Sequence, residues 1–233
     1  MSTLEAQKPP HYLRVALQSA LAAGFCLGLP AGLLLWLILF QWIHHSAVLQ
    51  PLIDFLRANG LYSIYILIAS SIFWSYLLGR ISGYRPWGWI AVASALGILV
   101  AWFSPLANID GILYEYQPTL PIHLNYAASM VGLIGSVTLF VGLAYGFILH
   151  NTKAALTIGL TTSVVSVVAV LLTILLFDSL GIRVGTGNLA MVRVTVVGLI
   201  TSALAGGAML GVGFRWFVED KSRRSSSQNI KNK

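Results

Sequence analysis

Charged residues are scarce in this sequence of 233 residues. Asp, Glu, Lys and Arg together make up 9% of the chain, whereas 57% of the residues are hydrophobic. A soluble domain carries about 25% charged residues, so this chain has too few of them to cover a surface that faces water. We therefore expect an all-α, polytopic integral membrane protein whose helices form one bundle, with lipid as their solvent.

Catalytic signatures are also missing. The one cysteine, Cys26, excludes an intrachain disulfide and lies in an apolar run as a small hydrophobe. The sequence has no H-E-x-x-H, G-x-S-x-G or C-x-x-C motif, and Gly185-Thr186-Gly187 lacks the Lys-Ser/Thr of a phosphate loop. None of the seven acidic residues lies near the middle of an apolar run, where ion pathways carry them. We therefore predict no enzyme and no metal site, and these features argue against an ion-coupled pump.

Long uncharged runs supply six candidate membrane crossings. A helix rises about 1.5 Å per residue and needs roughly 20 apolar residues to cross the hydrocarbon core. The first run is longer than this and contains Pro30, which predicts one long, kinked or tilted helix. After it, apolar and charged residues alternate in a pattern that predicts a short amphipathic helix in the interface, from near Pro51 to Asn59-Gly60. The predicted spans are residues 13–43, 62–80, 87–104, 124–150, 154–177 and 190–218.

Basic residues set the predicted orientation. Six crossings place both termini on one side, and of the 14 Lys and Arg residues only Arg57, Arg183 and Arg193 then fall on the other side. The positive-inside rule assigns the basic side to the cytoplasm. We expect a polar lead (1–12), a transmembrane domain (13–218) in the cytoplasmic membrane, the inner membrane of the cell, and a basic, disordered cytoplasmic tail (219–233). The net charge of +7 suits a rim that faces anionic lipid, so we expect no nucleic-acid partner.

Small residues recur at every fourth position in the fourth and sixth spans. In lipid, such faces let two helix backbones approach closely. They predict helix packing within the bundle and against other membrane proteins or further copies of this chain, with the lipid bilayer as the remaining partner. The predicted packing residues are Gly132, Ser136, Gly142, Gly146, Gly198, Ser202, Ala203, Gly206, Gly207 and Gly211.

Histidines are the candidate cofactor ligands, although the sequence identifies no cofactor. His44 and His45 end the first span and His123 begins the fourth, so all three lie at the predicted outer interface. Imidazoles there could hold a haem, a chlorin or a metal, or they could be polar caps of the helices. His150, beside a chain turn on the inner side, fits a helix C-terminal cap.

The longest polar connection, residues 104–122, is the candidate ligand or partner loop. Asp110, Tyr114, Glu115 and Tyr116 offer acidic and aromatic contacts on the outer side, either as a lid or docking surface or as a proline-stiffened connector. Arg183, beside glycines in another outer loop, either binds an anionic head group or is solvated.

Two main functions compete. The abundant small-residue faces favour a non-catalytic accessory or assembly subunit that packs against other membrane proteins. The alternative is a small-solute-binding or transport component with an intramembrane pocket, capped by the 104–122 loop. A haem or pigment carrier that uses the outer histidines is a third possibility.

Overall fold

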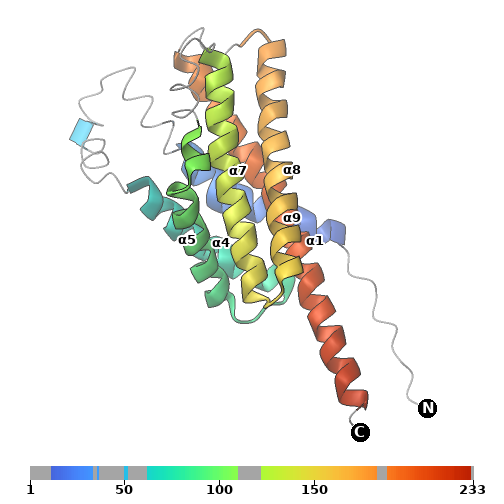
Figure 1. Cartoon of the computed structure of the whole chain (residues 1–233). Helices are drawn as coiled ribbons and strands as arrows, with labels where there is room; N and C mark the ends of the chain where they lie inside the picture. The colour runs from blue at the N-terminus through green and yellow to red at the C-terminus, as the bar shows by residue number, and fades with distance from the viewer. Residues whose placement is uncertain are drawn as a thin grey trace.

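The structure of the chain is a computed structural model that describes residues 12–33, 36, 50–51, 62–109, 122–182 and 188–231. Within these residues the protein is helical and has no strand. In chain order the elements are α1 (Tyr12–Ala23), the π-helical turn η1 (Gly24–Gly28), α4 (Tyr62–Ser82), α5 (Trp87–Trp102), the 3-10 turn η2 (Pro105–Asn108), α7 (Ile122–Ile148), α8 (Thr152–Ser179) and α9 (Asn188–Lys231) (Figure 1).

Several of these helices are suited to a membrane. Among the described residues, four helices are long and apolar enough to cross one: Tyr12–Leu33, Leu124–Ile148, Thr152–Ser179 and Val192–Lys221. The predicted second and third spans coincide with α4, of 21 residues, and with the shorter apolar α5. The prediction of an all-helical, membrane-embedded protein is confirmed at this level. The predicted interfacial helix lies outside the described residues except for Pro51.

The first span contains a π-helical turn. Leu29 donates its N–H to the carbonyl of Gly24, five residues earlier, in place of the usual bond over four residues. Pro30 follows directly and has no N–H to bond the carbonyl of Cys26. The distortion predicted at Pro30 is therefore a wider turn that lies just before it. Residues 34–35 and 37–43 of this predicted span lie outside the described part of the chain.

Neighbouring helices pack in antiparallel pairs. α4 packs on α5, α5 on α7, α7 on α8, α8 on α9, and α9 on α1. The pairing of α1 with α9 brings Tyr12 to Glu219 at one end and Gly32 to Val196 at the other. The main core joins large buried side chains from α4, α5, α7 and α9: Trp74, Leu78, Ile90, Tyr145 and Phe214.

α9 differs from the sequence prediction at its C-terminal end. The helix continues to Lys231, where a disordered tail was expected over 219–233, and it projects beyond the other helices (Figure 1). Residues 214–233 contain no glycine or proline to end it. Arg215 and Glu219 pair at the favourable i,i+4 spacing, 2.5 Å apart. The basic segment is therefore an extension of the last helix.

Candidate ligand groove between α5 and α7

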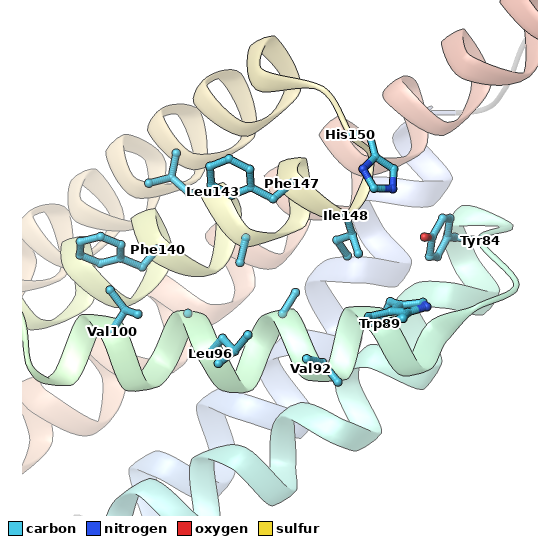
Figure 2. A pocket seen from close by; sticks show the side chains of 13 residues that line it. Tyr84, Trp89, Val92, Leu96, Val100, Phe140, Leu143, Phe147, Ile148 and His150 are labelled. Atoms are coloured by element: carbon cyan, nitrogen blue, oxygen red, sulfur yellow. The ribbon is translucent and has the colours of Figure 1, made fainter.

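An apolar groove of about 640 Å³ runs between α5 and α7 (Figure 2). Along α5 it reaches from Trp89 to Val100, about 16 Å at the rise of a helix. Its lining also includes residues of the turns that follow α4 and α7. The lining residues are Tyr84, Trp89, Val92, Ala93, Leu96, Gly97, Val100, Phe140, Leu143, Ala144, Phe147, Ile148 and His150.

Small residues hollow out this groove. Ala93 and Gly97 of α5 are buried, and a Cβ added to Gly97 would lie 2.7 Å from the Cα of Val141 on α7. The two helices therefore touch along a floor of small residues, which Ala144 completes. Large side chains stand at the sides of this floor, and many of them are exposed, such as Trp89 (61%), Leu96 (54%) and Phe147 (65%). The groove thus opens on the outer surface of the bundle.

The polar side chains of the groove gather at one end. Tyr84, Trp89 and His150 lie there, whereas Val100 and Phe140 lie at the other end (Figure 2). A phenol, an indole N–H and an imidazole are all able to donate hydrogen bonds. Tyr84 packs edge-on against Phe214 of α9, with ring centroids 5.4 Å apart. Burial raises the pKa of the Tyr84 hydroxyl above its usual value near 10, so at neutral pH it keeps its proton and remains a donor.

His150 has an uncommon backbone conformation at this end. Its φ of 54° lies in the left-handed region, where glycine or asparagine usually ends a helix. Its N–H bonds the carbonyl of Phe147 at 2.9 Å, and the Asn151 N–H bonds that of Gly146 at 3.4 Å. These two bonds form a Schellman motif, so His150 ends α7 as the sequence predicts. The Asn151 side chain then caps α8 by accepting the Ala154 N–H at 3.2 Å.

A buried hydrogen-bond network braces the helices behind the groove. Trp74 donates its indole N–H to the Tyr145 hydroxyl at 2.9 Å, and the same hydroxyl lies 2.6 Å from Ser94 Oγ. Ser94 is in turn 3.2 Å from Ser75 Oγ. All four side chains are at most 1% exposed, and such bonds are strong in a medium of low dielectric constant. The network fixes α4, α5 and α7 relative to one another, which holds both walls of the groove in place.

The predicted packing residues of α7 lie against neighbouring elements of the same molecule. A Cβ added to Gly142 would lie 2.6 Å from the Cα of Gly159, and one added to Gly146 would collide with Ala155, so both meet α8. Gly132 faces the backbone at Leu106. Ser136 bonds the carbonyl of Leu133 in its own helix at 2.9 Å.

The predicted packing residues of α9 are likewise used within the bundle. Gly207 and Gly211 face Ser19 and its neighbours on α1, and Gly206 faces Ser166 on α8. The others meet η1, α7 or α9's own backbone: Ala203 at Gly28, Gly198 at Met130, and Ser202 at the carbonyl of Leu199. The small-residue faces therefore join helices of this chain to one another.

Sequence reasoning missed two features. Gly24, Gly28 and Gly32 of the first span form a further ladder with four-residue spacing, and all three pack against α9. The same spacing rule that identified the packing residues of the sixth span would have found this ladder. It also missed the groove, because Ala93, Gly97 and Ala144 have no distinctive spacing along the chain.

Of the remaining candidate site residues, the structure describes only one. His123 belongs to α7, while His44, His45, Asp110, Tyr114, Glu115, Tyr116 and Arg183 lie outside the described residues. Within the described ranges, no group of three His, Cys, Asp or Glu side chains is placed to hold a metal ion.

The fold and the groove define a class: an all-helical, membrane-embedded protein with a ligand-sized, outward-opening groove. Comparison with known proteins adds no family, since no family model, curated protein or solved structure matches the chain.

Proposed function

We propose that the chain is a six-span protein of the cytoplasmic membrane with both termini in the cytoplasm. α4 and α5 supply the two further spans; the 21 residues of α4 extend about 32 Å, enough for a core of about 30 Å. The antiparallel pairing of α1 with α9 supports an even number of crossings. Basic residues support the orientation, because Arg14, Arg80, Arg85, Lys153, Arg215 and Lys221 all fall on the proposed inner side.

Within this topology, we infer a non-catalytic binding component that holds the hydrocarbon chain of a membrane-soluble ligand. The groove between α5 and α7 carries the proposal. Its volume of about 640 Å³ is within the range of about 300–1,000 Å³ that is typical of ligand sites. Its apolar floor, about 16 Å long at the rise of a helix, suits a hydrocarbon chain. This proposal differs from the solute-binding alternative of the sequence analysis, which expected an intramembrane pocket capped by the 104–122 loop, because the groove opens to lipid on the surface of the bundle.

A photoactivatable phospholipid tests the proposal. The protein is reconstituted in lipid nanodiscs that contain a phospholipid with a diazirine on one chain, and crosslinked peptides are identified by mass spectrometry. The expected products lie on the lining segments of α5 and α7. Labelling spread evenly over all the outer helix surfaces would contradict the proposal.

An accessory or assembly subunit is the second candidate. The small-residue faces no longer favour it, because they are occupied inside the bundle. The surface that such a partner would cover is the lipid-facing row of leucine and valine side chains along α8: Leu156, Leu160, Val164, Val168 and Leu172. A protein that co-purifies in a fixed ratio from native membrane would support this role. The haem or pigment carrier stays a prediction, and visible absorbance of the purified protein tests it.

A further inference from the structure

The polar end of the groove lies where the bundle leaves the proposed hydrocarbon core. Tyr84 belongs to the short link between α4 and α5, and His150 to the link between α7 and α8. Below them the lining is apolar as far as Val100 and Phe140 (Figure 2). A ligand that fills this groove therefore has a hydrocarbon chain, and its polar part lies beside the two links.

The charges around this end are positive. Arg85 follows Tyr84 and Lys153 follows His150 by three residues, and both side chains are exposed. α5 begins two residues before Trp89, and its N-cap, Pro86, provides no side-chain hydrogen bond. The N–H groups of Trp87 and Trp89 already donate to the carbonyls of Arg85 and Pro86, at 2.9 and 3.1 Å, so the α5 N-terminus contributes the positive potential of its dipole and not a set of free N–H groups.

Among the described residues, the acidic ones on this side of the bundle lie on α9. Glu219 is bonded to Arg215 at 2.5 Å and accepts a hydrogen bond from Tyr12 at 3.2 Å. Asp220, the other acid at this end, also has an interaction within the protein. Arg215 in addition donates to the carbonyl of Ser82 at 2.8 Å. Glu219 and Arg215 therefore neutralise each other. Arg85, Lys153 and the dipole of α5 give the surface beside the groove its positive charge.

His150 adds a second indication. A left-handed backbone is unfavourable for a residue with a side chain, and glycine would adopt it without strain. The chain has histidine there, and the imidazole lines the groove. Strained residues of this kind cluster at ligand sites, where the side chain has a role.

We propose that the groove binds an anionic phospholipid, with one acyl chain between α5 and α7 and the phosphate beside Tyr84, Arg85 and His150. This inference rests on the proposed function and adds the head group that the site selects. The cytoplasmic leaflet, where the proposed topology places this end, is rich in anionic lipid.

Two lipids with identical photoactivatable chains test the proposal, one with a phosphatidylglycerol head group and one with phosphatidylcholine. At equal mole fraction in nanodiscs, the anionic lipid is expected to crosslink to the lining segments of α5 and α7 several-fold more. Arg85→Gln should reduce this preference about fivefold, the contribution typical of one basic residue near a membrane surface. The matched control is Arg80→Gln, which should leave the preference unchanged. Both arginines are exposed, but Arg85 directly follows the lining residue Tyr84, whereas Arg80 is bonded to Tyr76 of its own helix at 3.3 Å.

His150→Gly separates a binding role from a structural one. Because glycine suits the left-handed position, the melting temperature of this variant should stay the same or rise, while the preference for the anionic lipid falls severalfold. Equal crosslinking of both lipids to the groove would overturn the anionic selectivity and leave the proposed function standing. No enrichment of either lipid in the groove would overturn both.

Discussion

Gly142 of α7 and Gly159 of α8 are in backbone contact, because a Cβ at Gly142 would lie 2.6 Å from the Gly159 Cα. Side chains do not separate the two helices at this point. In lipid, where helix association gains little from the hydrophobic effect, such contact is a main source of stability. The long α7–α8 hairpin depends on it.

Gly142→Ala should therefore destabilise the bundle. The added methyl group meets backbone atoms that cannot rotate away, and overpacking of this kind costs about 1–3 kcal/mol. Thermal unfolding in mild detergent measures the effect. Gly88→Ala is the matched control, since a Cβ at Gly88 would meet nothing within 4 Å. Equal melting temperatures for the two variants would show that the α7–α8 contact is looser than described.

Tyr145→Phe tests the buried network behind the groove. The change removes the hydroxyl that accepts from Trp74 and lies 2.6 Å from Ser94 Oγ, leaving the Trp74 indole N–H without this partner. A loss of stability of about 1–2 kcal/mol is expected, measured by the same unfolding assay. Tyr76→Phe is the control, because among the described residues the Tyr76 hydroxyl accepts a hydrogen bond only from the exposed Arg80, at 3.3 Å. A Tyr145→Phe variant as stable as Tyr76→Phe would contradict a bracing role.

Cysteine labelling tests the six-span topology. The native Cys26 is buried, so an impermeant thiol reagent should give little background. Ser179→Cys, at the exposed end of α8, should react in intact cells. Ser226→Cys, in the basic extension of α9, should react only after the membrane is permeabilised. Labelling of Ser226→Cys in intact cells would reverse the proposed orientation.

Much of the fold follows from local sequence. Lack of charge marks the long helices, and α8 is helical despite its many valines and threonines because a lone helix satisfies its own backbone in lipid. Four-residue spacing also marked Gly142 and Gly207 as packing positions. It could not show which helix each would meet, since a partner is a property of the assembled bundle.

The groove could not be predicted for the same reason. Ala93 and Gly97 on α5 and Ala144 on α7 are ordinary small residues in sequence, and they form a floor only because the helices bring them together. The helical extension to Lys231 was missed because a polar, basic composition is typical of disorder, whereas here an apolar helix leads into it without a break.

Blocking the groove tests the central claim most directly. Ala144→Leu adds bulk to the floor of the groove, and Ala69→Leu makes the same change at an exposed position on α4. With the photoactivatable phospholipid in nanodiscs, Ala144→Leu should lose most of the crosslinking to the lining segments of α5 and α7, and Ala69→Leu should retain it. Undiminished crosslinking in a folded Ala144→Leu variant would contradict a hydrocarbon chain in this groove.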